Sequence, residues 1–243
     1  MSKLLQHIWA AWGILVFAIL MFPALPFYVV AIAIWKGKAI QKVHFISRLW
    51  AGGIFLLCGI IARRMGPATL NRKQSYVLVS NHQSALDIPL CAVASANPFR
   101  FLSKAELGKI PVLGWIIRNI YLTVDRGNAA ARLKSMEKMK GALAEGSSLF
   151  LYPEGTRNRG NELTTRFYDG AFRLAIASQK PLGIMVIVNA KKLCPPKGFY
   201  LRPGILKYVW LPPVETTGYE AGQLEELKTK VKNQIEETLK QYA

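Results

Sequence analysis

Residues 75–89, SYVLVSNHQSALDIP, join a run of β-branched, aliphatic and aromatic residues to a polar turn that carries a histidine and an aspartate. The run at 75–80 has the composition of a strand. From Ser75 onward, similar short runs alternate with segments of helical periodicity. The sequence predicts strands at residues 75–80, 99–102, 120–124, 148–152, 184–189 and 205–211.

The strands of this region are nearly continuous in apolar residues, and helices separate them. This pattern is typical of an α/β fold, with a mostly parallel central sheet flanked by helices on both faces. A helix is expected at 128–145, with Leu133, Met136 and Leu143 on one face. From Ala221, apolar spacings of three and four predict an amphipathic closing helix. Its apolar face consists of Leu224, Leu227, Val231, Ile235 and Leu239.

The N-terminal region differs sharply from the rest of the chain. The 28 residues from Ile8 to Trp35 carry no charged side chain, and about 20 such residues suffice for a helix to cross a bilayer. Pro23 and Pro26 interrupt the run, so it forms either one kinked span or two short helices that dip into one leaflet. Tryptophans near its ends fit anchoring at the membrane interface.

A second apolar stretch, from Leu49 to Ala62, is 14 residues long. That length favours an interfacial or core helix over a span. We therefore predict membrane-anchoring helices at 1–65 and an α/β domain with the C-terminal helix at 66–243. Lysines and an arginine crowd the C-terminal flank of the first run, which predicts that the remainder stays on the cytoplasmic face of the inner membrane. The competing interpretation makes both stretches buried helices of a soluble protein.

The composition combines strong basicity with hydrophobicity. The chain has 243 residues, 32 Lys and Arg against 14 Asp and Glu, a net charge of +18 and 51% hydrophobic residues. Such a chain is too apolar for a disordered protein, and its charge favours an anionic membrane surface as a partner. Nucleic acid is the competing partner, but no basic tract interleaved with aromatics is present. The three isolated cysteines predict neither disulfides nor a zinc site.

The first candidate catalytic residues are His82 and Asp87. His82 follows the strand at 75–80, at the edge where open α/β sheets place their sites. A turn between the two residues can fold Asp87 onto the imidazole, so that the carboxylate holds one ring proton and the other nitrogen serves as a base. In the alternative interpretation, Asp87 is an ordinary N-cap of the next helix.

Two further strands end in residues that suit an anionic ligand. Gly155 allows a sharp turn, Thr156 supplies a hydroxyl, and Arg157 supplies a planar guanidinium suited to phosphate. Glu154 could orient that arginine or a substrate hydroxyl. Arg126 follows the strand at 120–124. The alternatives are a polar turn at 152–157 and a surface ion pair between Asp125 and Arg126.

In order and spacing, NHQSALD at 81–87, LTVDR at 122–126 and LYPEGTR at 151–157 resemble the signature blocks of glycerophospholipid acyltransferases. The resemblance is closest to bacterial 1-acyl-glycerol-3-phosphate acyltransferases and covers roughly residues 70–215. The segment at 104–107, with Ile110 and Pro111, is also similar to that family. The apolar N-terminus is similar in kind to the family's membrane anchors.

The resemblance implies a membrane-bound enzyme that moves a fatty acyl group from acyl-CoA or acyl carrier protein to lysophosphatidic acid, without a metal or cofactor. It implies that His82 is the general base and Asp87 its partner. The remaining implied site residues bind the glycerophosphate: Lys104, Arg126, Glu154, Gly155, Thr156 and Arg157. Alternative functions are acyl transfer to another lysolipid or to glycerol-3-phosphate, or non-catalytic binding to membranes.

Two departures from the family pattern bear on acceptor or donor preference rather than on the reaction. Members often carry Phe-Lys-x-Gly after the third block, whereas this chain has Tyr168 in place of the lysine. Many also carry Val-Pro-Val or Ile-Pro-Val, where this chain reads Gly-Ile-Met-Val at 183–186.

Overall fold

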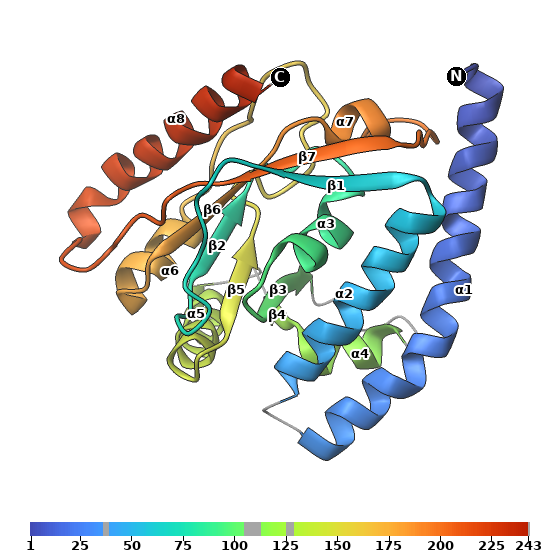
Figure 1. Cartoon of the computed structure of the whole chain (residues 1–243). Coiled ribbons are helices and arrows are strands. Elements are labelled where there is room, and N and C mark those ends of the chain that lie inside the picture. The colour runs from blue at the N-terminus through green and yellow to red at the C-terminus, as the bar shows by residue number, and fades with distance from the viewer. Residues whose placement is uncertain (36–38, 105–112, 125–128, 243) are drawn as a thin grey trace.

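The structure is a computed structural model that describes residues 1–35, 39–104, 113–124 and 129–242. Its described elements form an α/β arrangement preceded by a helical hairpin (Figure 1). The helices are α1 (Lys3–Trp35), α2 (Ile40–Leu57), α3 (Asp87–Ala94), α4 (Leu113–Ile120), α5 (Ala129–Ala144), α6 (Gly170–Ser178), α7 (Ala190–Leu193), the 3-10 turn η3 (Ala221–Gln223) and α8 (Leu224–Tyr242). The strands are β1 (Ile60–Met65), β2 (Val77–Ser80), β3 (Phe99–Lys104), β4 (Leu122–Val124), β5 (Ser148–Leu151), β6 (Leu182–Ile187) and β7 (Gly204–Trp210).

The described strands form one sheet in the order β1-β7-β6-β2-β5-β3-β4. All neighbouring pairs are parallel except β6 and β7. The predicted mostly parallel sheet is therefore confirmed, and every predicted strand overlaps an observed one. β2 lies between β6 and β5, so the turn after β2 has parallel neighbours on both sides.

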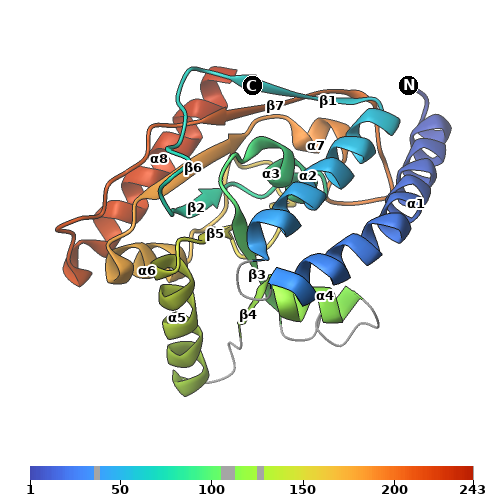
Figure 2. The same ribbon diagram turned by 60° about the horizontal axis from the view of Figure 1, so that its bottom comes forward.

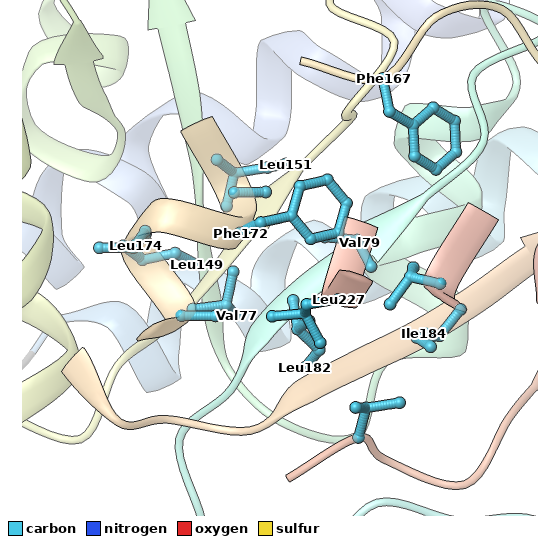
Figure 3. Close-up of a cluster of buried hydrophobic side chains, with 14 of the residues drawn as sticks. Val77, Val79, Leu149, Leu151, Phe167, Phe172, Leu174, Leu182, Ile184 and Leu227 are labelled. Carbon is cyan, nitrogen blue, oxygen red and sulfur yellow. The ribbon is translucent and has the colours of Figure 1, made fainter. Parts of the chain in front are cut away.

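Alternation along β2 divides the interior into two apolar layers. Val77 and Val79 face one layer, and Tyr76 and Leu78 face the other. The first layer packs under α5, α6 and α8, and Figure 3 shows its side chains around Phe172 and Leu227. The second packs under α2 and α3, with α1 outside α2, as the turned view in Figure 2 makes visible.

The C-terminal helix is built as the sequence predicts. The predicted apolar face of α8 is buried against the sheet; its members are Leu224, Leu227, Val231, Ile235 and Leu239. The expected helix at 128–145 is observed as α5, and its first expected residue, Asn128, lies outside the described residues. On α5, Leu143 is fully buried and Met136 packs on the core, but Leu133 is 69% exposed, so Leu133 does not share the buried face.

The second apolar stretch forms a helix only in part. α2 ends at Leu57, and residues 60–65 form β1, which pairs in parallel with β7. The expectation of a helix through Ala62 is therefore wrong for its last residues. Gly59, at φ +64°, makes the turn between helix and strand, because a left-handed residue ends a helix and glycine adopts that conformation at little cost.

The apolar N-terminal run is one helix rather than two. α1 spans Lys3–Trp35 with Pro23 and Pro26 inside it, and it bends along its length (Figure 1), as prolines in a helix interior require. Among the described helices, α1 has the length and apolar composition needed to cross a membrane. Much of its surface is exposed and apolar, so α1 is not the buried helix that the competing interpretation requires.

Two tryptophans of α1 bind the protein itself. The Trp9 and Trp12 indole N–H groups donate to the carbonyls of Cys58 and Leu57, at 3.0 and 2.9 Å. These carbonyls lie at the C-terminal end of α2, where they have no partners within the helix. The first half of α1 is thereby fixed to α2 beside the sheet.

Candidate active site

The register of β2 and β5 brings two sequence motifs together. The strands are parallel with Val79 opposite Leu151, so the residues three positions beyond this pair lie at the same level. Those residues are His82 and Glu154, and the His82 backbone N–H donates to Glu154 Oε1 at 2.8 Å. The edge predicted to hold the site does bring the first and third motifs into contact.

His82 and Asp87 form the predicted pair. Their Nδ1 and Oδ2 atoms are 2.8 Å apart, the His82 side chain is 13% exposed, and the Asp87 side chain is fully buried. Asp87 Oδ2 also accepts the backbone N–H groups of Gln83 at 2.6 Å and Ser84 at 2.8 Å. This oxygen accepts from three donors, so the contact orients the imidazole with its Nδ1–H toward Asp87. Nε2 of the imidazole is then left with its lone pair.

The alternative role of Asp87 as an N-cap does not fit this geometry. Asp87 is the first residue of α3, and its carboxylate accepts from residues 83 and 84, which precede the helix. A capping side chain would instead accept from N–H groups of the first helical turn. The carboxylate therefore shapes the turn that presents His82.

An aromatic ring supports the imidazole on one face. The rings of His82 and Tyr152 stack with centroids 4.0 Å apart and planes 16° from parallel. The Tyr152 hydroxyl lies 3.2 Å from Cys91 Sγ. Burial raises the pKa values of Tyr152 and Cys91 well above their usual range, so both remain protonated at neutral pH. A buried, protonated Cys91 is no nucleophile.

The Glu154 side chain is buried, and its hydrogen bonds fix the loop that follows β5. Its carboxyl group is buried; Oε1 accepts from His82, and Oε2 accepts the Thr165 backbone N–H and hydroxyl, both at 2.8 Å. The Asn158 N–H donates in turn to the His82 carbonyl at 2.8 Å. The loop after β5 is thus tied to the turn after β2 at several points, and sequence reasoning did not find Thr165 or Asn158.

The other residues of the third motif occupy the surface of this loop. Gly155 has φ +69°, and a Cβ there would lie 3.1 Å from the Tyr168 ring, so the position favours glycine. Thr156 and Arg157 are exposed. Within the described part of the chain, the Arg157 guanidinium has neither a hydrogen bond nor an ion pair.

Part of the expected site lies outside the described residues. Arg126 and the segments at 105–107 and 110–111 fall there, and Lys104 is the last residue of β3, with its side chain outside the description. Among the described residues, no cluster of three or more His, Cys, Asp or Glu suits a metal ion.

Two further residues of the first motif, Asn81 and Ser84, bind the β6 side of the turn. The Asn81 side chain both donates to and accepts from the backbone of Ile187, each at 2.8 Å. The Ser84 hydroxyl donates to the Cys194 carbonyl at 2.7 Å. The segment after β6, including α7, therefore lies against the turn that carries His82.

Comparison with known proteins agrees with this fold and gives the family of the chain. The family model described as Acyltransferase matches residues 62–188, just over half of the chain. The chain belongs to the acyltransferase family. It is therefore an enzyme of the class that transfers acyl groups, and the interpretation as a non-catalytic membrane-binding protein is set aside.

Individual relatives carry more specific names than the family model does. The chain is 29% identical over 209 residues to a 1-acyl-sn-glycerol-3-phosphate acyltransferase of Saccharomyces cerevisiae, covering 84% of this chain and 68% of that protein. It is 29% identical over 148 residues to the Helicobacter pylori enzyme of that name, covering 60% and 61%. A Chlamydomonas reinhardtii relative is 32% identical over 181 residues, covering 70% and 52%. The chain thus spans about half to two thirds of these relatives.

A solved structure has the same fold along nearly the whole chain. It is the 1-acyl-sn-glycerophosphate (LPA) acyltransferase PlsC of Thermotoga maritima, with a TM-score of 0.81 and 20% sequence identity. The match covers 99% of this chain and 97% of that one. It includes the N-terminal helical hairpin as well as the sheet.

Proposed function

We propose that this acyltransferase moves a fatty acyl group from an acyl thioester to the free hydroxyl of lysophosphatidic acid, giving phosphatidic acid. One observation carries the proposal: the His82–Asp87 pair, at 2.8 Å, lies on a turn bonded to the loop that carries the exposed Arg157. A base and a phosphate-binding cation on neighbouring loops suit an acceptor that has both a hydroxyl and a phosphate. The names of the relatives point to the same acceptor.

In the proposed reaction, His82 Nε2 takes the proton of the acceptor hydroxyl as its oxygen attacks the thioester carbonyl carbon. The new C–O bond forms, the C–S bond breaks, and the imidazolium returns the proton to the leaving thiolate. Asp87 holds the imidazole in the required tautomer and stabilises the imidazolium. No covalent enzyme intermediate is required, in keeping with the burial of Cys91.

The proposed roles of the remaining site residues follow their positions. Arg157, with Thr156 beside it, binds the acceptor phosphate from the loop after β5, and Arg126 and Lys104 are proposed to add cations from the β3–β4 side. Glu154 and Gly155 act by fixing the loop. Bringing base, hydroxyl and thioester together can lower a two-substrate barrier by about 7–11 kcal/mol, so the cations contribute mainly by orientation.

The helical hairpin is proposed to embed the enzyme in one leaflet at the cytoplasmic face of the inner membrane. The first half of α1 is held against the protein by Trp9 and Trp12. That leaves about 15 residues, or about 22 Å at 1.5 Å per residue, which is short of the roughly 30 Å hydrocarbon core. At its far end, Lys42 Nζ lies 5.5 Å from the Trp35 ring centroid, a pairing that suits lipid headgroups.

The proposal is tested by an acceptor panel with the purified enzyme in mixed micelles. Lysophosphatidic acid, glycerol-3-phosphate and lysophosphatidylcholine are each offered with acyl-CoA and with acyl carrier protein as donor. We expect lysophosphatidic acid to give the highest kcat/KM with at least one donor. A higher kcat/KM for glycerol-3-phosphate or lysophosphatidylcholine would contradict the proposed acceptor and leave the acyltransferase class intact.

A further inference from the structure

Lys191 is a cation at the site that none of the sequence motifs includes. It lies on α7, directly after β6, on the side of β2 opposite to β5. Its Nζ donates to the Gly160 carbonyl at 2.6 Å. The ammonium thus reaches from the β6 side to the loop that follows β5.

A short chain of contacts links this ammonium to His82. The Gly160 N–H donates to Asn158 Oδ1 at 2.9 Å, and the Asn158 N–H donates to the His82 carbonyl at 2.8 Å. Further along the chain from Lys191, the carbonyl of Cys194 accepts the Ser84 hydroxyl. Lys191 therefore sits at the rim of the turn that presents the base.

Carboxylates act on the Lys191 ammonium only from beyond salt-bridge distance among the described residues. Among the described residues it forms no ion pair. Glu154 is near enough to act on it electrostatically, but both oxygens of that carboxyl group already accept hydrogen bonds from His82 and Thr165. One carbonyl accepts one of three ammonium protons, so two remain for another acceptor.

Partial burial and two carboxylates act on the Lys191 ammonium in opposite senses. Partial burial lowers the pKa of Lys191 against the opposing effects of Glu154 and Glu162. An incoming phosphate would remove that disadvantage by supplying a close negative charge. Arg157 also lies near the segment after β6, because its charge is one cause that lowers the pKa of the Cys194 thiol.

We infer that Lys191 binds the phosphate of the acceptor, on the opposite side of His82 from the β3–β4 edge and together with Arg157. The inference rests on the proposed function, since it names a further residue for the same acceptor. It places phosphate-binding cations on both neighbours of β2, so that the acceptor hydroxyl is held over the imidazole from two directions.

The test compares Lys191→Met, Lys191→Arg and the matched control Lys192→Met, which alters the neighbouring exposed lysine of the same short helix. With lysophosphatidic acid as acceptor, we expect Lys191→Met to raise KM about tenfold or more, with kcat changed far less, because a charged hydrogen bond to the bound acceptor is lost. Lys191→Arg should restore most of the affinity, and Lys192→Met should match wild type.

Other outcomes would overturn the inference. If Lys191→Met lowers kcat with KM unchanged, or lowers the unfolding temperature markedly, Lys191 only fixes the Gly160 loop. An equal rise of KM in Lys192→Met would make the effect one of general surface charge. Failure of the wild-type enzyme to acylate lysophosphatidic acid would instead contradict the proposed function, and the inference with it.

Discussion

At the scale of single residues, Tyr152 is the side chain on which the orientation of His82 depends. The stacked rings, 4.0 Å apart, leave the imidazole with one face covered. We expect Tyr152→Leu to lower kcat about tenfold or more, since a misplaced base loses part of a contribution of about 10²–10⁴-fold. Tyr152→Phe keeps the ring and loses only the contact with Cys91, so its kcat should stay near wild type. Steady-state kinetics with saturating substrates measure kcat of both variants. Equal losses of kcat in the two would contradict the stacking role of Tyr152.

Gly155 carries a backbone requirement that a stability measurement can test. Its φ is +69°, and the Tyr168 ring lies 3.1 Å from the position that an alanine methyl group would take, so alanine costs about 1 kcal/mol in backbone energy and crowds the ring. Gly155→Ala should lower the Tm by about 2–4 °C or more. Gly141→Ala, inside α5 with open space around it, should raise or preserve the Tm, because alanine favours a helix. Unchanged thermal unfolding of Gly155→Ala would contradict the requirement.

The contact between His82 and Asp87 could be predicted from sequence because its geometry is local. Only one turn separates His82 from Asp87, so a strand end and a histidine–aspartate spacing suffice. The roles of Glu154 and Lys191 depend on sheet order, which places β5 and β6 on either side of β2. No local pattern encodes that order. The sequence around Thr165 and Lys191 therefore does not predict that these residues lie near His82.

At the scale of elements, α6 and α8 are joined by a charged contact with a defined pH dependence. Lys228 of α8 donates to Asp169 Oδ1 at 2.9 Å, and Arg173 approaches Oδ2 at 3.2 Å. The hydrogen bond from Lys228 is the main cause that lowers the pKa of Asp169. A lowered carboxyl pKa stabilises the fold above its ordinary value of about 4, and the gain is lost as pH falls through the folded-state value.

We therefore expect Lys228→Met to be less stable than wild type at pH 7, with a difference that shrinks as pH falls below about 4. The effect is small, since the Asp169 carboxylate is partly exposed. Thermal unfolding of both proteins from pH 7 to pH 3 measures it. Lys230→Met, on the exposed face of α8, is the control. A stability difference independent of pH would assign the effect to packing.

The elements themselves differed in how far the sequence predicts them. Strands flanked by helices were recognised by composition, and α8 by its periodicity, because each buries a face that its own pattern defines. The sequence predicts a helix where β1 begins, since Ile60 to Ala62 continue an apolar run. Its strand conformation comes from pairing with β7, which begins at Gly204. Pairing across such a distance in sequence leaves no local periodicity. Gly59 is the one residue in this stretch that indicates the end of the helix.

At the scale of the whole molecule, the exposed apolar surface of α1 should decide where the enzyme resides. Phe22 is 79% and Phe27 64% exposed, in the second half of α1. Each aspartate placed in a hydrocarbon environment is costly, by about 2.5–3.5 kcal/mol at the centre. Phe22→Asp with Phe27→Asp should greatly reduce flotation with vesicles of phosphatidylglycerol and phosphatidylethanolamine.

Leu133→Asp is the control, because that side chain is 69% exposed on α5, away from the hairpin (Figure 1). It should float as wild type does. Activity toward a short-chain, water-soluble lysophosphatidic acid should survive in the double variant, because α1 supplies none of the site contacts described. Equal flotation of the double variant and wild type would contradict membrane attachment through this half of α1.

The central claim is that the imidazole at the end of β2 accepts the proton of the lipid hydroxyl. Its most direct test is the single-turnover rate of acyl transfer to lysophosphatidic acid by purified His82→Ala, beside His7→Ala as a histidine control away from the site. We predict a loss of about 10²-fold or more in the chemical step of His82→Ala, with unchanged thermal unfolding and vesicle binding. His7→Ala should keep wild-type rates. A chemical step in folded His82→Ala as fast as in wild type would contradict the account.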